Sequence, residues 1–222
     1  MLAMPETGIG LVPDVGGTWL LSRAPGEAGT YLALTGARMS AADAIFAGFA
    51  DTFVESGRLA AVVEALQSAT GAGVSSAIAA FAGAAPPSEL AARAGEIDGI
   101  FSGARLEAIL AALAQSASAW AAKTAGLLGH KSPRAMKVAL AALRQARDLP
   151  SLEAALDVEF RIVTRLFEDG EFIEGVRALL VDKDKAPKWR PATVAEVSDA
   201  EVARLMAPLP PGLELGLATG SC

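Results

Sequence analysis

The sequence predicts a mostly α-helical chain that begins with a loop rich in glycine and proline. Hydrophobic residues make up 52% of the 222 residues and charged residues only 20%, which is ample material for a core and excludes a disordered chain. Glycines and prolines recur too often in residues 1–23 for a helix there. Most later segments instead repeat apolar residues at helical spacing.

The predicted elements follow one another with clear start and stop signals. The expected helices cover residues 26–35, 40–48, 58–70, 106–123, 132–148, 152–168 and 174–180. Ser132 is an N-cap candidate, and Pro133 occupies the first helical position, where a missing N–H costs nothing. Residues 51–54 are β-branched or aromatic and predict a short strand, and residues 71–103 predict short helices. After Pro187 we expect a loose tail.

Composition excludes several classes of protein and of site. The chain carries 19 Lys and Arg against 25 Asp and Glu, and without a basic block it is a poor match for nucleic acid. No run of roughly 18 apolar residues predicts a membrane span. The single cysteine, Cys222, and the single histidine, His130, exclude a disulfide framework and argue against a Cys- or His-based metal site. Without a visible signal peptide, the expected compartment is the cytoplasm.

Glu6 and Asp14 stand eight residues apart in the first loop, and a proline precedes each of them. The neighbouring glycines allow the backbone to fold tightly. Such a loop can bring two carboxyl groups to one cleft, one as base or nucleophile and the other to orient substrate or water. The spacing alone favours a surface turn that carries two solvated acids over a catalytic pair.

The loop sequence MPETGIGLVPDVGG, residues 4–17, resembles the crotonase (enoyl-CoA hydratase/isomerase) superfamily. Members carry the pattern Pro-Glu-x-x-x-Gly-x-x-Pro-x-x-Gly-Gly, and this version looks like the 3-hydroxyisobutyryl-CoA hydrolase branch. Residues 31–48, 132–140 and 172–189 resemble later blocks of the same family. The resemblance runs from about residue 1 to residue 197 and is thin between residues 70 and 120.

The resemblance implies a catalytic role for Glu6 and a substrate-orienting or proton-handling role for Asp14, so that both contact the substrate. Hydratases usually have glycine at position 14, whereas aspartate there follows the hydrolase pattern. The implied reaction is hydrolysis of a 3-hydroxyacyl-CoA thioester in valine breakdown. The acyl-CoA is then the substrate, and neither a cofactor nor a metal is required.

The resemblance also implies an α/β crotonase-like fold for complete members, of which this chain holds the mostly helical portion. We assign residues 1–54 to the catalytic-loop part of the core, 55–197 to a C-terminal helical region and 198–222 to a tail. Family members place two oxyanion-hole segments upstream of the Pro-Glu motif, so the chain is expected to be N-terminally truncated. By itself it is then expected to self-associate as a homo-oligomer and to lack turnover.

Two other functions stay open at this stage. An enoyl-CoA hydratase or isomerase would share the fold but is disfavoured by Asp14. A non-catalytic remnant would explain the missing N-terminal part. Among other residues, His130 is interpreted as a core or capping histidine, and the basic side chains of residues 183–190 as a solvated segment.

Overall fold

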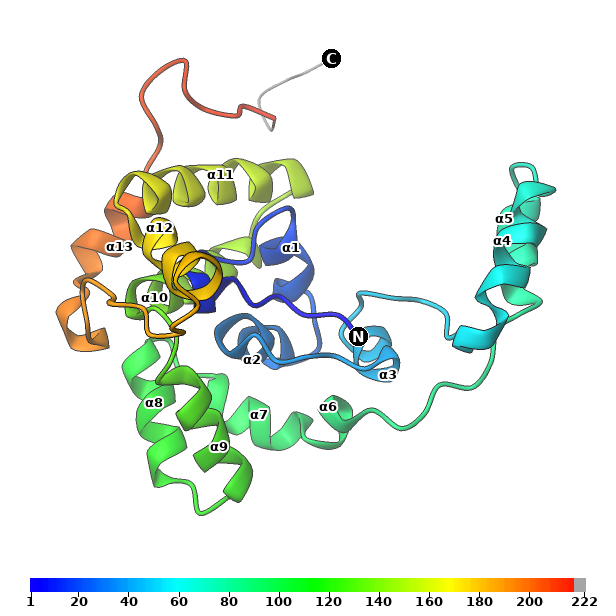
Figure 1. Cartoon of the computed structure of the whole chain (residues 1–222), viewed down its shortest axis with the longest axis horizontal. Coiled ribbons are helices and arrows are strands. Elements are labelled where there is room, and N and C mark those ends of the chain that lie inside the picture. Colours follow the sequence, from blue (N-terminus) through cyan, green and yellow to red (C-terminus); the bar gives the residue numbers. More distant parts are fainter. Residues whose placement is uncertain (218–222) are drawn as a thin grey trace.

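The computed structural model describes residues 1–217, which form an assembly of helices around one core (Figure 1). The first helices are α1 (Gly17–Ser22), α2 (Ala28–Thr35), α3 (Ala41–Phe46), α4 (Leu59–Gln67), α5 (Gly73–Ala79), α6 (Glu89–Ala92) and α7 (Ala94–Phe101). They are followed by α8 (Leu106–Gln115), α9 (Ala119–Leu128), α10 (Pro133–Ala146), α11 (Leu152–Glu168), α12 (Glu171–Val176) and α13 (Asp199–Met206). Short 3₁₀ turns are η1 (Glu6–Ile9), η2 (Ser56–Arg58) and η4 (Val194–Glu196), and η3 (Arg177–Val181) is a π-helical turn.

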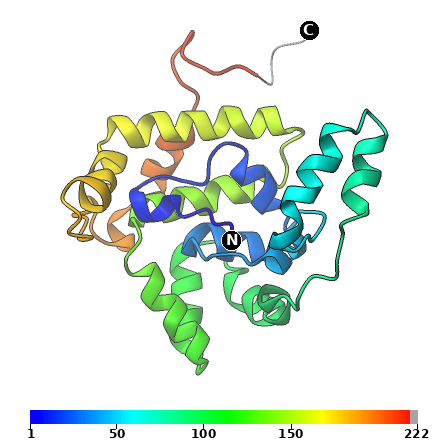
Figure 2. The same ribbon diagram turned by 45° about the vertical axis from the view of Figure 1, so that its right-hand side comes forward.

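Helix α10 is the centre of the core. It starts where expected, because the Ser132 side chain accepts a hydrogen bond from the Ala135 N–H and Pro133 occupies the first turn. Most of its residues are buried, and it packs against α1, α2, α11 and α13. Figure 2 shows α10 running beneath α11, with the first turns of the chain close by. The loop that carries Glu6 and Asp14 therefore lies against the central helix of the core.

Helices α4 and α5 pack on each other and project from this body (Figure 1). Neither helix contains a buried residue, and two extended segments connect the pair to α3 and α6. None of the helices in residues 1–217 combines the length and the apolar composition needed to cross a bilayer.

Three secondary-structure predictions were wrong. Residues 51–54 are extended but form no strand, because no neighbouring strand of the described chain lies beside them to pair with. An isolated antiparallel bridge between Leu2 and Met39 is the strand-like pairing in residues 1–217. The helix expected over 106–123 is two helices, since Ser118 starts α9 afresh by capping it at the Ala121 N–H. Residues 1–23 hold η1 and the helix α1.

The segment after Pro187 is also more ordered than expected. It contains η4 and α13, and Val197 and Leu205 are fully buried against the core. Helix α13 therefore lies within residues 198–222, which we had assigned to a tail. Cys222 falls outside the described residues, and the domain boundaries at residues 54 and 197 stay a prediction.

Candidate carboxylate site

Glu6 begins the 3₁₀ turn η1, whose shape follows from its glycines. The Gly8 N–H donates to the Pro5 carbonyl at 2.9 Å, and the Leu11 N–H donates to the Glu6 carbonyl at 2.9 Å. Gly10 ends the turn in the left-handed region, with φ of 76°. An added Cβ at Gly10 would lie 2.5 Å from the Glu171 carbonyl oxygen, so a larger residue would separate the turn from α12.

Three helices fix the position of η1. The Thr7 hydroxyl donates to the Leu34 carbonyl of α2 at 3.2 Å, and the Ser132 N–H before α10 donates to the Thr7 carbonyl at 3.0 Å. Gly175 of α12 packs so closely that an added Cβ would lie 2.2 Å from the Ile9 carbonyl oxygen. Residues far apart in the sequence thus set the orientation of the Glu6 backbone.

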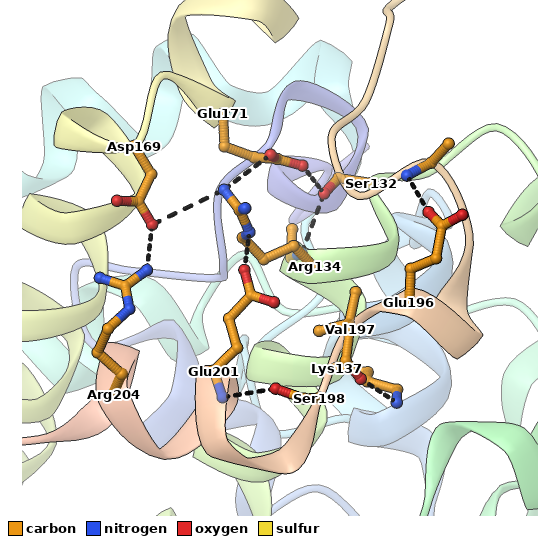
Figure 3. A network of polar contacts seen from close by, with 12 residues as sticks. Ser132, Arg134, Lys137, Asp169, Glu171, Glu196, Val197, Ser198, Glu201 and Arg204 are labelled. Carbon is orange, nitrogen blue, oxygen red and sulfur yellow. Dashed lines mark hydrogen bonds and ion pairs between the residues drawn. The ribbon is translucent and has the colours of Figure 1, made fainter.

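A polar network holds these supports together (Figure 3). The buried Ser132 hydroxyl donates to the Glu171 carboxylate, which also pairs with Arg134 at 3.2 Å. Arg134 in turn binds Glu201 of α13 at 2.7 Å. The C-terminal helices α12 and α13 are therefore bound to the start of α10. Ser132, the residue at this start, also donates its N–H to the Thr7 carbonyl of η1.

Asp14 lies at the start of a tight turn. The Gly17 N–H donates to the Asp14 carbonyl at 2.7 Å, and both central residues have positive φ, 50° at Val15 and 85° at Gly16. Two positive φ values are the mark of a type I′ turn. For a β-branched residue such as Val15 this conformation is strained, and such strain is characteristic of functional loops.

Glu159 of α11 holds the residues that follow Asp14, and the sequence analysis missed it. Its carboxylate accepts hydrogen bonds from the Gly16 N–H at 2.8 Å, from the Thr18 N–H at 2.9 Å and from the Thr18 hydroxyl. These are free donors at the start of α1, so Glu159 serves as an N-terminal cap from a distant helix. A signal was present: Glu159 falls on the apolar stripe formed by Ala155, Val158, Ile162 and Leu166.

The surroundings of Glu6 favour its neutral form. Burial raises the pKa of Glu6 to about 7, the nearby acids Asp14 and Glu159 raise it as well, and Lys131 lowers it. Its Oε2 atom is buried and has no hydrogen-bond partner among the described residues. Burial also raises the pKa of Asp14. Glu6 therefore changes charge near neutral pH, as a general base or acid should.

Lys131 connects the loop to two cavities. It lines a cleft of about 710 Å³ together with Tyr31, Trp120 and Leu127, and a smaller cavity of about 240 Å³ together with Gly8 and His130. The larger cleft has apolar walls and carries Arg38, Arg93 and Lys123 against Asp43 and Glu89. It is large enough for a drug-sized ligand.

The structure brings the two predicted site residues, Glu6 and Asp14, within electrostatic reach of each other. The catalytic and substrate-binding roles of Glu6 and Asp14 stay predictions. His130 is exposed directly after the end of α9, so the core alternative for this histidine was wrong, while the capping alternative stays a prediction. The side chains of Lys183, Lys185 and Lys188 are exposed, as expected of a solvated segment. Two acids of the same segment, Asp182 and Asp184, form ion pairs with Arg177.

Comparison with known proteins gives a family match over most of the chain. The model of the enoyl-CoA hydratase/isomerase family matches residues 1–206. The mitochondrial 3-hydroxyisobutyryl-CoA hydrolase of Gallus gallus is 36% identical over 217 residues, which are 94% of this chain and 56% of that protein. The human protein of the same name is 35% identical over 210 residues, 91% of this chain and 54% of its own length. The chain thus spans about half the length of these curated relatives.

Two solved structures share the fold. A carnitinyl-CoA dehydratase from Mycobacterium thermoresistibile superposes with a TM-score of 0.88 and 44% identity, over 95% of this chain and 60% of that one. An enoyl-CoA hydratase from Rhodobacter sphaeroides 2.4.1 gives a TM-score of 0.85 and 41% identity, with the same coverage.

Proposed function

The chain belongs to the enoyl-CoA hydratase/isomerase family, and from this premise we propose that its loop serves the hydrolysis of a 3-hydroxyacyl-CoA thioester, namely 3-hydroxyisobutyryl-CoA. The observation that carries the proposal is the pairing of Asp14 with Glu6 in one anchored loop. The curated relatives named as 3-hydroxyisobutyryl-CoA hydrolases support it.

Glu6 is the principal catalytic carboxylate in this proposal. Its pKa of about 7 lets it accept a proton from the attacking water, or attack the thioester carbonyl itself, while it is anionic. The attacking oxygen bonds to the carbonyl carbon, and the carbon–sulfur bond breaks to release the CoA thiolate, which takes up a proton. If Glu6 itself attacks, the product is an acyl–Glu6 anhydride, and water then hydrolyses it to release the acid and restore the Glu6 carboxylate. Asp14, which lies at the start of the turn of residues 14–17, orients the substrate or accepts and donates the proton.

The remaining expectations about partners belong to the same proposal. CoA enters as part of the substrate, without a cofactor, a metal, nucleic acid or a membrane as partner. The complete family members have an α/β crotonase-like fold, and self-association of the isolated chain is a further expectation. A cytoplasmic location stays a prediction, while the names of the curated relatives include the word mitochondrial.

The direct test follows two reactions on the purified protein, in a version that spans the full length of its curated relatives. Free thiol released from 3-hydroxyisobutyryl-CoA reports hydrolysis, and loss of the conjugated double bond of crotonyl-CoA reports hydration. We expect thiol release to exceed hydration. Hydration without thiol release would replace the proposal by an enoyl-CoA hydratase function, the activity for which the similar Rhodobacter sphaeroides 2.4.1 protein is named. A folded protein with neither activity would support a non-catalytic role.

Replacing Asp14 by glycine separates the two chemistries. Asp14→Gly restores the hydratase-like loop and relieves none of the strain at Val15, so we expect kcat for thiol release to fall about tenfold or more while KM changes little. The measurement is steady-state thiol release, with circular dichroism to check the fold. An unchanged kcat would show that Asp14 is only a surface acid of the loop.

A further inference from the structure

We propose that Lys131 is a positioning residue, whose ammonium group lies beside the turn that carries Glu6 and favours the anionic form of its carboxyl, and that Gly8 is a glycine because it admits this ammonium. The inference rests on the proposed function, because it concerns the same carboxylate. Neither the sequence pattern nor the comparisons assign a role to Lys131.

The position of Lys131 is set by the backbone on both sides. Its N–H donates to the Leu128 carbonyl at the end of α9 at 3.0 Å, and the following residue, Ser132, bonds to Thr7 beside Glu6. The lysine therefore leaves the chain directly opposite the turn η1. Lys131 is half-buried, and its side chain lines both the larger cleft and the smaller cavity.

Two glycines make room for the ammonium. A Cβ added at Gly8 or at Gly36 would lie 3.2 Å from Lys131 Nζ, so either side chain would crowd it. The same Cβ at Gly36 would lie 2.9 Å from the Cα atom of Pro5, the residue before Glu6. Lys131, η1 and the end of α2 thus meet at one point, and the positive charge lies against the backbone that carries Glu6.

The charge around Glu6 explains why a cation is needed there. Asp14 and Glu159 face it from the second turn and from α11, and both disfavour its anion. Turn η1 also packs on α2, α10 and α12. On these helices, Glu171 is paired with Arg134 at 3.2 Å. Two influences oppose these acids and lower the Glu6 pKa: a backbone hydrogen bond at Glu6 and the attraction of the Lys131 ammonium.

The test measures the Glu6 carboxyl directly, without substrate. In protein labelled with ¹³C at glutamate carboxyl groups, the Glu6 resonance is identified by its loss in Glu6→Gln, and its titration gives the pKa. We expect Lys131→Met to raise the pKa of Glu6 from about 7 to about 8. The matched control is Lys183→Met, which removes the same charge at an exposed position and should leave the Glu6 titration unchanged.

A second variant covers the case in which Lys131→Met does not fold. Lys131→Gln removes the same charge but keeps a polar side chain at this position, so the Glu6 pKa should rise as it does in Lys131→Met. An unchanged Glu6 titration in a folded Lys131→Met or Lys131→Gln protein would overturn the inference.

Activity then separates this inference from the function on which it rests. In active protein, the acid limb of the thiol-release profile should move to higher pH in Lys131→Met, with a rate loss of about tenfold at pH 6. If the wild-type protein releases no thiol but the Glu6 titration still depends on Lys131, the hydrolase proposal fails and the role of Lys131 stands. If thiol is released and the Glu6 pKa is the same in Lys131→Met as in the wild-type protein, only the positioning role of Lys131 fails.

Discussion

In a version of the protein that spans the full length of its curated relatives, replacing Glu6 by glutamine is expected to lower thiol release from 3-hydroxyisobutyryl-CoA by about a hundredfold or more. Glutamine keeps the shape of the side chain but can neither accept the proton nor attack as a carboxylate. In the wild-type protein, hydrolysis should rise with pH through about 7, because Glu6 must lose its proton to act and burial holds its pKa near that value. The measurement is kcat across pH 5–9, and near-normal turnover in the variant would remove Glu6 from the mechanism.

The same variant should not weaken the fold. The folded pKa of Glu6 is raised, so the folded state prefers the protonated carboxyl, and the ionised form costs stability as pH rises from about 4.5 to about 7. Glutamine removes that cost, so at pH 8 the variant should melt at the same temperature as the wild-type protein or higher. A lower melting temperature would mean that lost activity reports on folding rather than on catalysis.

Replacing Glu159 by alanine is expected to lower the free energy of unfolding by about 2 kcal/mol or more. The change leaves the N–H groups of Gly16 and Thr18 and the Thr18 hydroxyl without their acceptor at the start of α1. The loss is limited because burial already raises the Glu159 pKa and so disfavours its charge. The measurement is urea unfolding at pH 7, with Glu168→Ala as a control on the exposed surface of the same helix, expected to change stability by less than about 0.5 kcal/mol.

Glu159→Gln distinguishes loop support from general packing. Glutamine retains one acceptor oxygen, so the stability loss should be smaller than for alanine, and the Asp14 turn should stay closer to its native place. Thiol release should then decrease in the order wild type, Glu159→Gln, Glu159→Ala. Equal stability of the alanine variant and wild type would show that water replaces the carboxylate and that Glu159 does not hold the turn.

Local chemistry determined a large part of this structure from the sequence. The Ser132 cap lies where expected, and local signals of the same kind bound α3 and α2, namely the capping box of Ser40 with Asp43 and the glycine after α2, because each signal acts within four residues. The helices at 132–148 and 152–168 were predicted by the same short-range periodicity. Glu6 and Asp14 could be selected as the candidate pair because the loop pattern is contiguous.

Tertiary structure alone decided how that pair is supported. Glu159 and Lys131 lie more than a hundred residues from the loop in the sequence. Glu159 holds the loop by hydrogen bonds to Gly16 and Thr18, and the charge of Lys131 lowers the Glu6 pKa, so both effects arise only in the folded chain. The same holds for the missing strand at 51–54, since a strand exists only with a neighbour to pair with. The order of η4 and α13 also depends on distant partners, because the burial of Val197 and Leu205 requires the surfaces of α10 and α11. The candidate residues of the loop could therefore be identified from the sequence. The burial and the charges that set the Glu6 pKa arise only when the helices pack.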